Sequence, residues 1–294
     1  MAASSRRPAP DPGGREHFAA FSFVDRIVEL VAGRHARGSY LVPPAISAFP
    51  PCLVAEAVGQ LAAWVAMDHI GFRGRPVAAL ANETRFHAAV APGETLELSV
   101  DIESCDDEAV AYSGRARVGG ADVIELVDCL GPMLPVEEFD SPAELASRLK
   151  LLRGAGATPG AFGGVSPLVA EQTGGAQGET ATAVLRIPEH APFFADHFPR
   201  RAVFPATLLL DSEIELAMRL AGESTHWPPG AKLSPSRMTH VKMRAFIPPG
   251  ATLDVGAELT RTGDDSATVR LSATMDAKTV ATARLEVRAT GAAT

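Results

Sequence analysis

Residues 193–215 read FFADHFPRRAVFPATLLLDSEIE, and this stretch decides how the rest of the chain is interpreted. It predicts a short extended entry, a proline-rich bend around His197, and a helix that begins near Pro205. Asp211 lies inside that apolar helix, 14 residues after His197. A histidine beside a turn and a carboxylate within an apolar helix are the side-chain types that general base and general acid catalysis require.

An earlier segment repeats this pattern. Residues 49–60, FPPCLVAEAVGQ, match residues 204–215, FPATLLLDSEIE, at an offset of 155 residues. This alignment places Glu56 at the position that corresponds to Asp211. A second pair of segments matches at an offset of 157 residues, APGETL (91–96) and PPGATL (248–253). Two matches with nearly the same offset indicate an internal duplication with small insertions.

Both halves show the same change of apolar period, which predicts an α+β fold. In each half, a long apolar helix precedes segments in which apolar and polar residues alternate. We therefore expect one helix wrapped by an antiparallel sheet, formed twice. The sequence predicts helices over 50–67, 142–153 and 207–221, strands over 77–81, 95–102, 109–118, 122–133, 181–187, 239–247, 252–260, 267–275 and 279–287, and loops over 31–48 and 226–235.

Composition shifts suggest where the units begin and end. The N-terminus is rich in Pro, Gly and Arg, which predicts disorder. A capping box, Ser141-Pro142-Ala143-Glu144, is expected to start a short helix in the connector. The predicted division is a disordered tail (1–17), a first unit (18–136), a linker with a short helix (137–165) and a second unit (166–290).

Charge and cysteine content exclude several classes of function. The net charge of −8 argues against broad affinity for nucleic acid or an anionic membrane. The chain has three scattered cysteines, Cys52, Cys105 and Cys129, whose spacing argues for a reducing compartment and against a zinc site. The longest apolar helix contains Glu56 and Gln60 and is too short to span a bilayer. With no signal peptide in the sequence, we expect a cytoplasmic protein without a metal.

Residues 193–205 resemble the His-Phe-Pro…Pro signature of bacterial β-hydroxyacyl-acyl-carrier-protein dehydratases, which have the hotdog fold. Residues 21–30 are similar to the opening segment of that family. Two further segments resemble its strand and Pro-Gly turn, 82–96 and 241–253. Because the resemblance covers 18–134 and 166–288, it implies a tandem double hotdog, a covalent version of the family's dimer. Single-chain dehydratases of polyketide and polyunsaturated-fatty-acid synthases are similar in this respect.

The resemblance implies a catalytic pair whose members come from different halves. In the family, a histidine removes the α-proton of a 3-hydroxyacyl thioester, and a carboxylate of the other protomer protonates or holds the departing hydroxyl. Transferred to this chain, His197 is the base and Glu56 is the carboxylate. Val42 stands where the first half would carry its own histidine. The second pair, Val42 and Asp211, is therefore expected to be inert.

Further residues are assigned to substrate binding. Gln60 lies four residues after Glu56 on the same helix face, so we expect it to bond Glu56 or the leaving hydroxyl. The family polarises the thioester carbonyl with backbone N–H groups at a helix N-terminus. Pro51 has no N–H, so a contact there would have to use the amide of Cys52. The other assigned positions are Phe194, Phe198 and Ala206.

Each assignment has a structural alternative. His197 could instead hold a turn, Cys52 could be a packing residue, and Asp211 could have a purely structural role. Arg200 and Arg201 could meet a phosphopantetheine or an acidic carrier, or could simply be solvated. The remaining histidines lack metal-ligand spacing.

The function implied is dehydration of a 3-hydroxyacyl thioester to the trans-2-enoyl thioester, a hydro-lyase reaction of fatty-acid or polyketide-type biosynthesis. The substrate would be carried on acyl carrier protein or CoA and would bring its own phosphopantetheine, so no separate cofactor is expected. Hydration and double-bond isomerisation use the same groups. A hotdog thioesterase and a non-catalytic acyl or carrier binder are the alternatives. Whether two such chains form a homodimer is left open.

Overall fold

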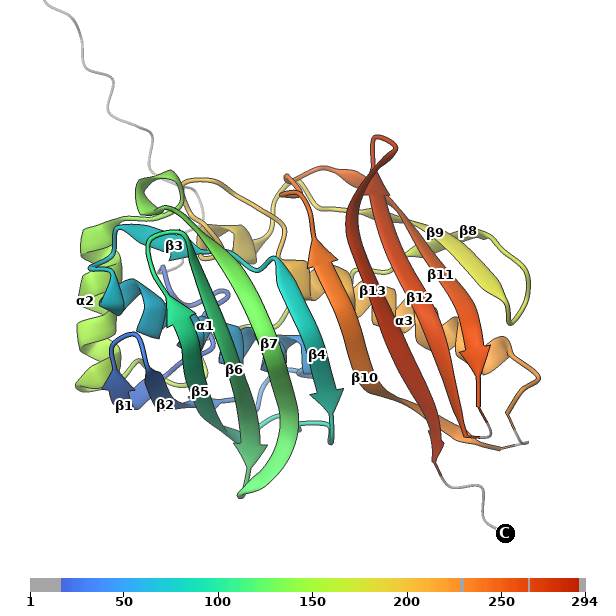
Figure 1. Cartoon of the computed structure of the whole chain (residues 1–294), viewed down its shortest axis with the longest axis horizontal. Coiled ribbons are helices and arrows are strands. Elements are labelled where there is room, and N and C mark those ends of the chain that lie inside the picture. The colour runs from blue at the N-terminus through green and yellow to red at the C-terminus, as the bar shows by residue number, and fades with distance from the viewer. Residues whose placement is uncertain (1–16, 228–229, 264, 291–294) are drawn as a thin grey trace, which may run out of the picture.

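A computed structural model describes residues 17–227, 230–263 and 265–290 (Figure 1). The predicted disordered tail, apart from its last residue, lies outside the described residues. The first half contains β1 (Arg26–Val31), β2 (His35–Leu41), α1 (Pro51–His69), β3 (Gly74–Pro76), β4 (Leu80–Phe86), β5 (Thr95–Cys105), β6 (Ala109–Val118) and β7 (Ala121–Pro135). The connector contains η1 (Val136–Glu138) and α2 (Pro142–Arg153). The second half contains β8 (Glu171–Gly174), β9 (Thr180–Arg186), η2 (Pro192–Ala195), α3 (Ala206–Glu223), β10 (Lys232–Met243), β11 (Thr252–Thr262), β12 (Ser266–Met275) and β13 (Lys278–Thr290).

The described strands form one continuous antiparallel sheet. Its order is β1-β2-β5-β6-β7-β4-β10-β13-β12-β11-β9-β8, with β3 paired to β7 outside this path. The order of the first half is mirrored in the second, as an internal duplication requires. The halves meet where β4 pairs with β10, with Thr84 opposite Met238. This arrangement is the α+β double hotdog that the sequence predicted.

Helix α1 begins where the sequence has two prolines. Pro51 is its first residue, a position at which the missing N–H breaks no intrahelical bond. The helix is apolar on most sides, and Leu61, Ala62 and Val65 have no exposed surface. Such a helix needs cover all round. The sheet and α3 provide it, and Figure 1 shows α1 and α3 together behind the sheet.

The prediction of a loop over residues 31–48 is wrong, because β2 lies within it. Its inward-facing residues Ala36 and Tyr40 are buried. Between them, a side chain on Gly38 would meet the carbonyl oxygen of Arg26 in β1 at 2.6 Å. Glycine is therefore needed for the close approach of β1 and β2.

Other boundaries also differ from the prediction. β4 begins at Leu80 rather than at residue 77, and β10 ends at Met243 rather than at residue 247. β10 also begins at Lys232, inside the predicted loop 226–235, because it pairs with β13 there. The short strand β8 was not predicted.

Helix α2 begins at the expected residue, but the predicted capping box is wrong. The side chain of Ser141 makes no capping hydrogen bond. Instead, its amide donates to Oδ1 of Asp140 over 2.9 Å. In the described part of the chain, no helix is long and apolar enough to cross a membrane.

Candidate active site

His197 lies in the loop between η2 and α3, where hydrogen bonds hold both the ring and the loop. Nδ1 of His197 lies 3.0 Å from the carbonyl oxygen of Val203. Because a carbonyl only accepts, Nδ1 carries the proton, and Nε2 of the neutral ring keeps its lone pair. The adjacent Asp196 accepts hydrogen bonds from the amides of Phe18 and Phe21. These bonds attach the loop to the N-terminal segment of the first half.

The surroundings of His197 favour its neutral form. Burial lowers the pKa of His197 below its ordinary value, Glu56 acts in the opposite direction, and Arg75 reinforces the lowering. The edge of the ring packs against Phe21, with the two ring centroids 5.5 Å apart. A neutral imidazole with a free Nε2 can accept a proton at neutral pH.

Glu56 lies in α1 and receives two hydrogen bonds, one from each half of the chain. Nε2 of Gln60 donates to its Oε1 over 3.0 Å, and Oγ1 of Thr207 donates to its Oε2 over 2.9 Å. Gln60 is itself oriented, because its Oε1 accepts the amide of Phe23 and its Nε2 also donates to the carbonyl of Phe21. The carboxylate is therefore held from two sides.

One cavity of about 220 Å³ brings these groups together. His197 and Glu56, which come from different halves, both line it. Its wall follows α1 from Ala55 to Trp64 and includes residues of β6, β7, α2 and β10. Most of these side chains are apolar or aromatic, so the cavity suits an apolar ligand.

The N-terminus of α3 also reaches the cavity. Ala206 is the first residue of α3 and lines the wall beside Thr207. The first N–H groups of a helix have no intrahelical acceptor, and the helix dipole favours negative charge there. This end of α3 can therefore polarise a carbonyl oxygen.

The structure brings together some of the assigned binding residues and separates others. Gln60, Phe198 and Ala206 line the cavity. Phe194 is buried and is not part of the cavity lining. Cys52 is also buried and outside the lining. Its thiol is influenced by Asp211, a member of the pair that is expected to be inert.

That other pair lies away from the cavity. Val42 has no exposed surface, and neither Val42 nor Asp211 lines the cavity. Burial, with a smaller effect of Glu215, raises the pKa of Asp211 to about 6. Burial raises the pKa of the Cys52 thiol well above its ordinary value, and Asp211 adds to this. The thiol is therefore a poor nucleophile.

Two residues of this site were not predicted from the sequence. Thr207 bonds Glu56 across the interface of the halves, and Cys52 is its counterpart at the offset of 155 residues. The duplication offered a signal for Thr207, because Thr207 lies four residues before Asp211 and Cys52 lies four residues before Glu56. The second residue is Arg75 of β3, which lines the same cavity.

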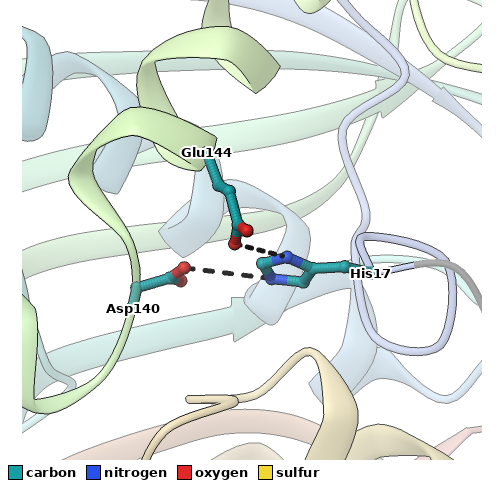
Figure 2. Close-up of side chains that lie close together, drawn as sticks. All are labelled: His17, Asp140 and Glu144. Atoms are coloured by element: carbon teal, nitrogen blue, oxygen red, sulfur yellow. Dashed lines mark ion pairs between the residues drawn. The ribbon is translucent and has the colours of Figure 1, made fainter. Parts of the chain in front are cut away.

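A separate cluster contains His17, Asp140 and Glu144, where the N-terminal segment meets α2 (Figure 2). Nε2 of His17 lies 3.9 Å from Oδ1 of Asp140, and Nδ1 lies 3.5 Å from Oε2 of Glu144. Each ring nitrogen thus faces a different carboxylate. We interpret the cluster as contacts that attach the N-terminal segment to α2.

Comparisons with known proteins agree with this fold and identify a dehydratase family. The model of the ApeI-like dehydratase family matches residues 172–284. A 3-hydroxyacyl-acyl-carrier-protein dehydratase FabZ of Caldanaerobacter subterraneus is 33% identical over 114 residues, which are 35% of this chain and 81% of that protein. The corresponding enzyme of Roseiflexus castenholzii is 33% identical over 121 residues, 37% of this chain and 84% of that protein.

Solved structures with the same architecture include a thioesterase and a protein of unknown function. An acyl-ACP thioesterase from Bacteroides thetaiotaomicron superposes with a TM-score of 0.52 at 9% identity, covering 86% of this chain and 98% of that one. A hotdog-fold protein of unknown function from Alicyclobacillus acidocaldarius superposes with a TM-score of 0.51 at 12% identity, covering 94% of this chain and 98% of that one. At these identities the likeness concerns the fold alone.

Proposed function

Because this chain belongs to the hotdog-fold dehydratase family of the FabZ enzymes, we propose that it is a hydro-lyase that dehydrates a 3-hydroxyacyl thioester to the trans-2-enoyl thioester. One observation carries the proposal. His197, whose Nε2 carries a lone pair, and Glu56, whose carboxylate accepts two hydrogen bonds, share one largely apolar cavity. The two residues come from different halves of the chain.

In the proposed reaction His197 is the general base. Its Nε2 takes the proton from C2 of the substrate while the Nδ1–H stays on the carbonyl of Val203, which keeps the ring in place. The electrons of the C2–H bond form the C2=C3 double bond, and the C3–O bond breaks. The resulting imidazolium is stabilised by the nearby Glu56.

Glu56 acts on the leaving hydroxyl. In its acid form it gives a proton to the departing oxygen, so that water leaves, and the proton held by His197 then returns to Glu56. The pair thus carries one proton throughout the cycle. Thr207 and Gln60 position the carboxyl group so that it faces the cavity.

The thioester carbonyl is assigned to the N-terminus of α3. The amide of Ala206 lies in the first turn, where N–H groups lack helical acceptors. Developing negative charge on the carbonyl oxygen is stabilised there, which acidifies the C2–H bond. The contact proposed for Cys52 is not part of this scheme, because Cys52 does not line the cavity.

The carrier is proposed to be acyl carrier protein, as in the names of the relatives, or CoA, within fatty-acid or polyketide-type biosynthesis. No cofactor is required by the scheme. Mass spectrometry of 3-hydroxyacyl thioesters incubated with the wild type, His197→Ala and Glu56→Gln tests it. We expect loss of water with the wild type and turnover lowered about 10²- to 10⁴-fold in both variants. Release of free acid would identify a thioesterase, and binding without conversion would identify a non-catalytic acyl binder.

A further inference from the structure

Arg75 places a positive charge on the wall of the acyl cavity. It lies in β3 and lines the cavity that His197 and Glu56 share. Its Cζ lies 5.3 Å from the centre of the Phe198 ring, and its Nη1 lies 3.5 Å from Sδ of Met67. An aromatic face and a thioether orient the guanidinium, but neither neutralises its charge.

The guanidinium lacks an anionic partner in the described part of the chain. No carboxylate oxygen there lies within 4.0 Å of its nitrogens, and its Nε is shielded from solvent without a hydrogen-bond partner. The nearest acidic groups, Asp140 and Glu56, act on it only from a longer distance. Glu56 accepts Gln60 and Thr207, whereas Asp140 accepts the amide of Ser141 at Oδ1 and leaves its buried Oδ2 without a hydrogen-bond partner in the described chain.

Arg148, the other arginine on the cavity wall, is engaged differently. Its Nη2 donates to the carbonyl of Phe18 over 3.4 Å, and its Cζ lies 5.0 Å from the Phe18 ring. Arg148 therefore helps to hold the N-terminal segment. Only Arg75 combines a place on the cavity wall with a shielded donor that nothing in the described chain satisfies.

We propose that Arg75 binds a carboxylate on the far end of the acyl chain, so that the preferred substrate is the half-thioester of a 3-hydroxy dicarboxylic acid. A guanidinium matches a carboxylate with two parallel hydrogen bonds. A methyl-terminated chain would exclude water from the guanidinium of Arg75 without offering it a hydrogen-bond acceptor. A site with a buried polar group rejects such analogues strongly. This proposal rests on the proposed function, since it concerns the same cavity.

The first test measures binding without turnover. Isothermal titration calorimetry would use pantetheine amides of succinic, glutaric and adipic acids, each compared with the methyl-terminated amide of equal chain length. These compounds carry no 3-hydroxyl group, so they cannot be dehydrated. We expect the wild type to bind at least one ω-carboxylate compound about tenfold more tightly than its matched control, and Arg75→Met to lose this preference. Equal or tighter binding of every methyl-terminated compound by the wild type would overturn the proposal.

Two further variants separate recognition from folding. Arg75→Lys keeps the charge but loses the fork, so it should retain part of the preference. Asp140→Asn tests a purely structural role. If Arg75 only stabilised Asp140, both Arg75→Met and Asp140→Asn would lower the melting temperature and leave the ligand preference unchanged. Since none of these readouts needs catalysis, failure of the carboxylate proposal would be distinguishable from failure of the dehydratase proposal.

Discussion

The two halves of the chain have the same order of strands, but only one half carries a histidine at the position equivalent to His197. His197 in the second half corresponds to Val42 in the first, and Glu56 in the first corresponds to Asp211 in the second. The pair His197 and Glu56 lines a cavity, whereas Val42 is completely buried and Asp211 lies outside that cavity. In a homodimer every substitution occurs in both sites. A fused chain can keep one complete pair while the other becomes part of the core.

The largest expected difference between the halves comes from replacing each of the two equivalent carboxylates, Glu56 and Asp211, with its amide. Glu56→Gln should lower kcat about 10²- to 10⁴-fold, because the amide cannot donate the proton that the leaving hydroxyl needs. Asp211→Asn is the matched control at the equivalent position and should keep kcat within about threefold of wild type. Steady-state assays of enoyl product measure both. The opposite ranking would mean that His197 works with the carboxylate of its own half.

A second contrast concerns Glu213 and its counterpart Val58, both completely buried. Neither carboxyl oxygen of Glu213 has a hydrogen-bond partner among the described residues. Burial raises the pKa of Glu213 from 4.5 to about 8. The acid form is therefore favoured by folding, and the contribution of Glu213 to the free energy of unfolding is highest below pH 4.5, falls as the pH rises from 4.5 to about 8 and is level above.

The total loss should be about 3 to 5 kcal/mol. Glu213→Leu places an apolar side chain where the other half has Val58 and should remove this part of the pH dependence. Urea unfolding at pH 6 and pH 9 measures the part of this loss that falls between pH 6 and pH 8, about 3 kcal/mol, with Val58→Leu as the control that keeps the wild-type pH dependence. An equal loss of stability between these pH values in Glu213→Leu would contradict the assignment.

A third experiment tries to rebuild the missing base. Val42→His should lower the free energy of unfolding by about 2 kcal/mol, because a polar ring replaces a smaller side chain in a packed core. Urea unfolding measures this change. In the Glu56→Gln background, the same substitution should restore no activity. Recovery of turnover in that double variant would show that the second pair still has the geometry of an active site.

The smallest expected effect concerns Thr207 and Cys52, which are equivalent positions on α3 and α1. Thr207→Val removes the hydroxyl that donates to Glu56 and should lower kcat about tenfold, with little change in KM. Cys52→Ala changes the corresponding side chain outside the cavity and should alter kcat less than about twofold. Steady-state kinetics compare the two. Similar losses in both variants would indicate a general effect on the interface of the halves.

The helices and most strands could be predicted because their patterns are local. Proline marks the first turn of α1, and the alternation over residues 109–118 predicted β6 with its correct ends. β2 and the start of β10 were missed because Gly38 and Pro235 interrupt their patterns. Both segments become strands through pairing with other strands, which overrides local preference.

The candidate site was predictable where duplication and motif provided a position, and not where side chains meet only after folding. The position of Glu56 follows from the aligned segments, and its pairing with His197 was implied by the family resemblance of residues 193–205. The bond between Thr207 and Glu56 depends on how α3 approaches α1, and the placement of Arg75 depends on a three-residue strand. Such contacts leave no periodic signal in the sequence.

The pairing of β4 with β10 has a consequence for behaviour at low concentration. Two separate hotdog subunits lose an active site shared between them when dilution drives them apart. Here the two halves are joined by one backbone, so their association is intramolecular and has an effective concentration on the order of millimolar. Specific activity should then be constant down to the lowest enzyme concentration at which product can be detected. A cell could keep very few copies of this chain without losing assembled sites.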